Sequence, residues 1–124
     1  MPKTSDSPAP QSFLPLKPVE FLILMTVADG ERHGYGIMLD IAERTAGTVR
    51  LEAGGLYRSI RRLLSDELIA ESTKRPAADE DDERRRYYTL TSLGRRVVAA
   101  EALRLRALVR AAEASRIIDP EPAR

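Results

Sequence analysis

The sequence predicts a mainly α-helical fold with a small β-hairpin and a long C-terminal helix. Three observations indicate this class: a nearly uniform apolar stretch at 19–28, a stretch at 54–69 with one apolar and one arginine-rich side, and two short β-favouring segments at 68–74 and 84–90. A chain of 124 residues has room for one domain with a modest core.

The composition excludes several classes of site. The chain has no cysteine and one histidine, so disulfides, thiolate zinc sites and His-based metal clusters or catalytic triads are excluded. No nucleophile, base or metal-ligand set has credible spacing. We therefore expect a protein that is not an enzyme, with no catalytic residues, no metal and no cofactor. No apolar run is long enough to span a membrane and the first residues lack a signal-peptide pattern, so a cytoplasmic protein is expected.

The formal net charge of +1 hides a local asymmetry. The acidic run at 79–83 holds five of the 19 acids, which leaves 14 acids against 20 bases, a net charge of +6, in the rest of the chain. A basic character concentrated in part of a chain is typical of nucleic-acid binding. The acidic run itself has two interpretations of equal weight: a solvated loop, or a competitor with DNA for neighbouring arginines.

The chain is predicted to have four parts. Residues 1–15 form a flexible proline-rich arm, although Phe13, Leu14 and Leu16 could dock on the domain. Residues 16–92 form the main domain, 93–118 a C-terminal helix and 119–124 a flexible tail. The stretch 19–28, preceded by Pro18, is expected to be the central buried helix. A second helix follows from 33–36 and stops at Gly47, before a short β-favouring connection at 48–52.

The next helix has two unlike faces. At 100° per residue, one side of this helix is apolar and has Tyr57 at its margin; its residues are Leu56, Ile60, Leu63 and Leu64. The opposite side carries Arg58, Arg61, Arg62 and Ser65. Guanidinium groups suit phosphates and the guanine edge in a DNA major groove, so this is interpreted as a recognition helix in a helix-turn-helix order. Periodicity alone would also fit an ordinary amphipathic surface helix.

The C-terminal part begins with a predicted two-stranded hairpin at 68–74 and 84–90, in which one of Tyr87 and Tyr88 faces the core. Thr91 is a plausible N-cap for the last helix. Glu101 and Arg104, three residues apart, could pair locally or across the dimer. This helix is expected to be about 35 Å long. Its apolar residues cover a wider part of its circumference than packing on one domain needs. We therefore predict that it packs against a second copy through Leu93, Val97, Ala100, Leu103, Leu105, Leu108 and Val109.

Three motifs in order carry a resemblance. These are residues 33–37 (His-Gly-Tyr-Gly-Ile), 54–57 (Gly-Gly-Leu-Tyr) with 61–63 (Arg-Arg-Leu), and 87–91 (Tyr-Tyr-Thr-Leu-Thr) followed by Gly94 and Arg95. Together they cover about 17–96, and the chain resembles the PadR family of bacterial transcriptional regulators, in the shorter subclass with a single C-terminal dimerisation helix. The resemblance implies a winged helix-turn-helix DNA-binding domain, a repressor-like function and a homodimer.

The resemblance also assigns residues. The recognition-helix set would contact bases or phosphates of a pseudo-palindromic operator, whereas Arg58 stands where the family usually has proline. The family wing is usually short and basic, but here its tip is acidic, so the wing's DNA role is carried over only to the hairpin stems. The stem residues are Lys74, Arg75, Arg84, Arg85 and Arg86. A small hydrophobic or aromatic effector near the dimer interface is also implied, with no pocket residues assigned.

Three further residues are weaker DNA-binding candidates. His33 is expected to be structural or to contact phosphate, and Tyr35 and Tyr57 to pack with their hydroxyls at the surface. Two other functions compete with this interpretation: a helical protein-protein adaptor, which would not need the arginine face, and a dimeric repressor of another winged-helix family.

Overall fold

The computed structural model describes residues 8–72 and 86–122 of the chain. In order, the elements are a 3-10 helix η2 (Pro10–Phe13), α1 (Pro18–Ala28), β1 (Arg32–His33), α2 (Gly34–Arg44), α3 (Ala53–Ser65), β2 (Ile69–Glu71), β3 (Tyr87–Leu90) and α4 (Ser92–Ala114). This mainly helical architecture with one small sheet confirms the predicted fold class.

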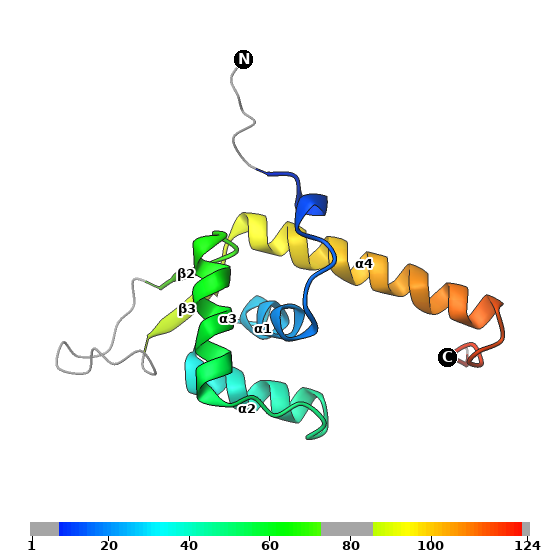
Figure 1. Cartoon of the computed structure of the whole chain (residues 1–124), viewed down its shortest axis with the longest axis horizontal. Coiled ribbons are helices and arrows are strands. Elements are labelled where there is room, and N and C mark those ends of the chain that lie inside the picture. The colour runs from blue at the N-terminus through cyan, green and yellow to red at the C-terminus, as the bar shows by residue number, and fades with distance from the viewer. Residues whose placement is uncertain (1–7, 73–85, 123–124) are drawn as a thin grey trace, which may run out of the picture.

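Helix α1 is the centre of the domain, because it contacts α2, α3, α4 and β3. Figure 1 shows α1 in the middle of these helices, with α3 crossing it and α4 running along one side. Ile23 and Leu24 have no exposed surface and Val27 is buried. The nearly uniform apolar character of this stretch therefore reflects burial on several sides, as predicted.

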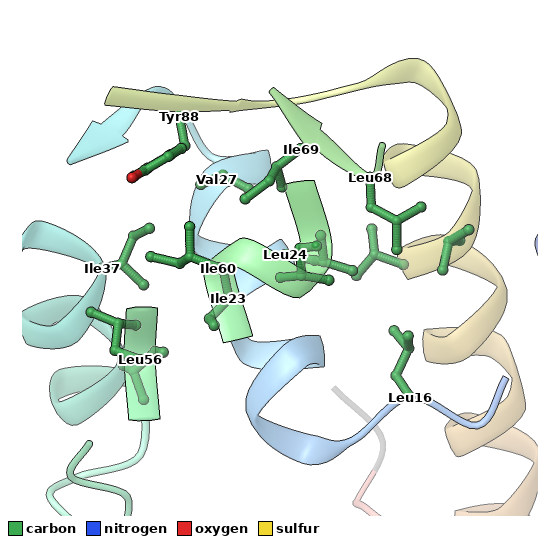
Figure 2. Packing of buried hydrophobic residues seen from close by; sticks show 14 of the residues in the cluster. Leu16, Ile23, Leu24, Val27, Ile37, Leu56, Ile60, Leu68, Ile69 and Tyr88 are labelled. Carbon is green, nitrogen blue, oxygen red and sulfur yellow. The ribbon is translucent and has the colours of Figure 1, made fainter. Parts of the chain in front are cut away.

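The core is filled from elements far apart in the sequence. Figure 2 shows Leu24 of α1, Ile60 of α3 and Ile69 of β2 gathered around one centre, with Tyr88 and Leu16 at its margins. Because α3 contributes its whole apolar side to this cluster, its rotation about its own axis is fixed. Its opposite side is therefore held toward solvent.

The sheet has three antiparallel strands in the order β1-β3-β2. Ile69 pairs with Leu90 and Glu71 with Tyr88, as expected for the predicted hairpin. The third strand, β1, was not predicted: Arg32 pairs with Tyr88 and His33 with Tyr87. A strand of two residues has no alternation that could indicate it, so only the fold brings it to the edge of β3.

Helix α4 begins with a side-chain cap, since the Thr91 hydroxyl accepts a hydrogen bond from the backbone N–H of Gly94 at 2.9 Å. The helix was predicted to reach residue 118, but it ends at Ala114. Arg116 has a φ of 62°, and the N–H of Ile117 donates to the carbonyl of Ala112 at 2.9 Å. This is a left-handed C-terminal turn, formed here without glycine.

The range predicted as a flexible arm includes ordered structure. Residues 1–7 lie outside the described residues, but η2 contacts α4. Phe13 and Leu14 pack against the core and Leu16, just after the arm, is buried in it, so these three residues dock on the domain. The N–H of Leu16 donates to Oε2 of Glu101 at 3.2 Å, and Arg104 donates to both oxygens of the same carboxylate at 2.7 and 2.8 Å. Of the two predicted alternatives for Glu101 and Arg104, the structure has the local pair, and the carboxylate of Glu101 also holds the chain just before α1.

The hydrogen bonds from Arg104 lower the pKa of Glu101 below its ordinary value, even though burial acts in the opposite direction. The pKa of Arg104 is raised by the same pair. Both groups are therefore charged over the ordinary pH range. Across the part of the chain that the structure describes, no helix is long and apolar enough to cross a membrane.

Candidate nucleic-acid interface

The α3 helix presents the predicted arginine face. Leu56 and Ile60 have no exposed surface, and Leu63 and Tyr57 are also buried. Arg58, Arg61 and Arg62 are exposed on the other side, and so is Ser65 at the end of the helix. The structure therefore brings all four recognition-helix candidates to one solvent-facing surface, with the apolar side anchored in the core.

Arg62 of this face has one long ion pair with a neighbouring acid. Nε of Arg62 lies 4.0 Å from Oδ2 of Asp66, one turn later, and both side chains are substantially exposed. An ion pair at that distance between exposed groups is weak and easily exchanged for another anion. The α3 face thus offers guanidinium groups on a rigid element to an anionic partner.

The three weaker candidates occupy different environments. The imidazole Nδ1 of His33 accepts a hydrogen bond from the N–H of Gly36 at 2.9 Å, which caps α2. Its ring also meets that of Tyr87 edge-on, at a centroid distance of 5.3 Å. Of the two expectations for His33, the structure supports the structural one, since its side chain caps α2.

Tyr35 and Tyr57 also differ from each other in how exposed their side chains are. Tyr35 is 54% exposed in the first turn of α2 and can reach a partner, whereas Tyr57 is 7% exposed. The Tyr57 ring lies directly against the backbone of Gly34, where a Cβ atom would come within 2.7 Å of the ring carbons. Tyr57 therefore belongs to the α2–α3 packing. The predicted alternation in β3 is present as well, with Tyr88 buried and Tyr87 half-buried.

Only the base of the hairpin is described. Nη1 of Arg86 lies 3.2 Å from Oε2 of Glu71 on the neighbouring strand, so this stem arginine is paired across the sheet. The other stem candidates (Lys74, Arg75, Arg84 and Arg85) and the acidic run at 79–83 lie outside the described residues.

The predicted dimerisation set divides into two groups along α4. Val97 has no exposed surface, so the role predicted for it is corrected to packing within the chain. Leu93 is half-buried and packs partly against the domain core. Leu103, Leu108 and Val109 are 58%, 55% and 47% exposed, while Leu105 and Ala100 are half-buried. Figure 1 shows why: the C-terminal half of α4 extends beyond the other helices.

Two features of the interface were not singled out as site residues from the sequence. Gly54 and Gly55 lie in the first turn of α3, one turn before the arginines, with Gly54 exposed and Gly55 half-buried. An open hollow of about 670 Å³ lies between the end of α3, β2 and the start of α4; its lining includes Leu64, Ile69 and Leu93. Among the described residues, no group of acids and histidine could hold a metal ion.

Comparison with known proteins agrees with this geometry. Residues 23–100 match the family model of the PadR-like family of transcriptional regulators. An uncharacterized protein of Lysinibacillus sphaericus is 31% identical over 77 residues, which cover 62% of this chain and 68% of that protein.

Solved structures share the fold at lower identity. A PadR family transcription regulator from Clostridium difficile has a TM-score of 0.65 and 23% identity, over 78% of this chain and 96% of that one. The structure of Bacillus subtilis PadR in complex with operator DNA has a TM-score of 0.56 and 18% identity, over 87% of this chain and 51% of that one.

Proposed function

Because the chain belongs to the PadR-like family of transcriptional regulators, we propose that it represses transcription by binding a pseudo-palindromic DNA operator as a homodimer. The observation that carries the proposal is the face of Arg58, Arg61 and Arg62 on α3, exposed opposite an apolar side that is fixed in the core. The solved complex of Bacillus subtilis PadR with operator DNA supports DNA as the partner.

In this proposal α3 enters the major groove. Arginine side chains then make bidentate contacts to guanine or charged contacts to phosphate, and Ser65 adds a hydroxyl at the end of the helix. The exposed Tyr35 at the start of α2 and the stem cations of the hairpin, Lys74, Arg75, Arg84, Arg85 and Arg86, would hold the DNA backbone and fix the register. His33 contributes by capping α2, and Tyr57 by setting the angle between α2 and α3.

The second subunit of the homodimer supplies the recognition helix that reads the second half-site of the operator. Two α3 helices related by a two-fold axis would read successive major grooves about 34 Å apart. The exposed apolar residues on the protruding half of α4 (Leu103, Leu108 and Val109) support a second copy as the partner of that helix. Bound at a promoter, such a dimer would obstruct RNA polymerase, which is the repressor part of the proposal.

A small hydrophobic or aromatic effector completes the proposal. The open hollow has a size in the range of small-molecule sites, and its walls come from the end of α3 and the start of α4. A ligand bound there would touch both the DNA-reading helix and the helix of the proposed dimer. Its binding would appear as ligand-dependent release of DNA.

The central test is a fluorescence-anisotropy titration of wild type, Arg61→Ala and Arg62→Ala. The probes are a duplex selected by the wild-type protein from a random-sequence pool and a scrambled duplex, at several salt concentrations. Each substitution should weaken binding to the selected duplex by about 1–3 kcal/mol if it removes a base contact. A lost phosphate contact should instead flatten the salt dependence by about one unit of slope.

Arg95→Ala, at an exposed position in the first half of α4, is the matched control and should leave both quantities unchanged. If Arg61→Ala and Arg62→Ala kept the wild-type affinity and salt slope, α3 would not be the DNA-reading element. Equal, weak binding of wild type to both duplexes would favour the protein-adaptor function instead.

A further inference from the structure

The glycines of this chain differ in why the fold needs them. Five of the seven have a reason within the domain: a positive φ at Gly30 and Gly47, and neighbouring atoms that a Cβ would approach closely at Gly34, Gly36 and Gly94. Gly54 and Gly55 have no such reason. Their backbone is helical. Among residues 8–72 and 86–122, a Cβ at Gly54 would meet nothing within 4 Å, and one at Gly55 would meet only Nη2 of Arg58, at 3.7 Å.

Both glycines weaken the helix that contains them. Glycine is less favourable than alanine in a helix, because its unfolded chain has more conformational freedom to lose. Since alanine would fit at both positions, the isolated chain would be more stable with it. A pair of consecutive glycines that the described domain does not require therefore points to a constraint from outside that domain.

The position of the two glycines shows on which side of α3 that constraint acts. Gly54 lies four residues before Arg58 and Gly55 seven residues before Arg62, spacings that place each pair on the same side of a helix. The backbone of Gly54 is exposed to solvent. The two glycines thus extend the arginine face by one turn, as a strip of bare main chain beside the guanidinium groups.

We propose that this strip, Gly54 and Gly55, is a DNA-contact surface, where a sugar–phosphate wall of the groove lies against the main chain of α3. The inference rests on the proposed function and adds to it a positioning role for residues that have no side chain. Without Cβ atoms, the start of α3 can approach the duplex more closely than any other residue type would allow. That approach sets the depth of α3 in the groove, and so determines which base edges Arg58, Arg61 and Arg62 reach.

The experiment compares Gly54→Ala, Gly54→Leu and Gly55→Ala with wild type in the anisotropy assay with the selected and scrambled duplexes. Thermal unfolding is measured on the same samples. The matched control is Ser92→Ala, which places a stronger helix former in the exposed first turn of α4, away from the arginine face.

The glycine variants should unfold at the same temperature as wild type or higher, while Gly54→Ala binds the selected duplex on the order of tenfold more weakly. Gly54→Leu should bind more weakly still, since the larger side chain holds the helix further away. Ser92→Ala should bind as wild type does. Improved stability together with lost affinity is a combination that a purely structural role cannot produce.

The experiment distinguishes failure of this inference from failure of the proposed function. If Gly54→Ala and Gly54→Leu bound DNA as tightly as wild type while Arg61→Ala weakened binding, the proposed function would stand and this inference would be overturned. Lower unfolding temperatures in the glycine variants would also overturn it, because the glycines would then serve the fold. If wild type did not discriminate between the duplexes and Arg61→Ala had no effect, the proposed function would fail, and this inference with it.

Discussion

At the scale of single residues, close contacts determine how the helices and the sheet fit together. Gly94 allows the first turn of α4 to pack on the strand region, since a Cβ there would lie 2.0 Å from the carbonyl oxygen of Leu68. Gly34 allows the ring of Tyr57 to lie on the backbone of α2. Such contacts explain why a tyrosine at the margin of the predicted apolar side of α3 is buried.

Gly94→Ala should therefore destabilise the domain, although alanine is the better helix former. The added methyl group would force α4 away from the backbone of Leu68, and overpacking of this kind costs about 1–3 kcal/mol. Urea unfolding followed by circular dichroism would measure the change in free energy of unfolding. Gly54→Ala, which meets no neighbouring atom, is the internal comparison and should shift the midpoint in the opposite direction. An unchanged midpoint for Gly94→Ala would show that α4 does not lie this close to Leu68.

At the scale of elements, the carboxylate of Glu101 joins three parts of the chain. It is 2% exposed, and it binds Arg104 within α4 and the N–H of Leu16, just before α1. Removing one partner of such a buried group leaves the others without a counterpart, which is costly. The contact between α4 and the segment that contains η2 thus depends on one ionised side chain.

The stability of the domain should consequently depend on pH through Glu101. Because the folded-state pKa of this carboxyl is lowered, its contribution is fully present above the unfolded-state pKa of about 4.3 and is lost as the pH falls through the folded value. Glu101→Gln should be less stable than wild type at pH 7 by about 1–3 kcal/mol, as for a buried polar group that loses its partner.

The difference between the two proteins should narrow as the pH falls below about 4, because wild type then loses what the variant already lacks. Urea unfolding between pH 3 and pH 7 measures both effects. Glu113→Gln, farther along α4, provides a control with the same chemical change at a half-buried glutamate. A pH-independent difference between Glu101→Gln and wild type would mean that the carboxylate is not the group that titrates.

At the scale of the whole molecule, α4 is longer than the domain against which it packs. Its first half contributes Val97 and Val98 to the core, whereas Leu108 and Val109 of the second half are about half exposed. Figure 1 shows this half of α4 extending away from α1, α2 and α3. The proposed dimer would bury the apolar surface that the domain itself cannot reach.

The double substitution Leu108→Asp and Val109→Asp should weaken self-association while leaving the domain folded, because both side chains lie outside the core. Loss of buried interface residues should raise the free energy of dimerisation by about 2 kcal/mol or more. Light scattering and sedimentation give the mass, and circular dichroism checks the helix content. Ala99→Asp, an exposed position on the first half of α4, is the control. A wild-type protein that is monomeric at all concentrations would refute the dimer.

Much of the interface was predictable from the sequence because it depends on local periodicity. In α3, residues Leu56, Ile60 and Leu63 alternate with Arg58, Arg61 and Arg62 at helical spacing, and this pattern fixes both faces before any tertiary contact forms. The Thr91 cap and the Glu101–Arg104 pair are likewise contacts between residues three apart. The order of motifs along the chain also placed it in its family.

The tertiary structure alone decided the rest, because it depends on which distant segments meet. The strand at Arg32 and His33 exists only because β3 lies beside it, and the burial of Val97 follows from where the domain ends along α4. The glycines show the same difference between what the sequence determines and what the tertiary structure determines. The sequence places Gly34, Gly54 and Gly94 at the starts of helices, but only the packed chain distinguishes the two that make close internal contacts from Gly54, which faces open space.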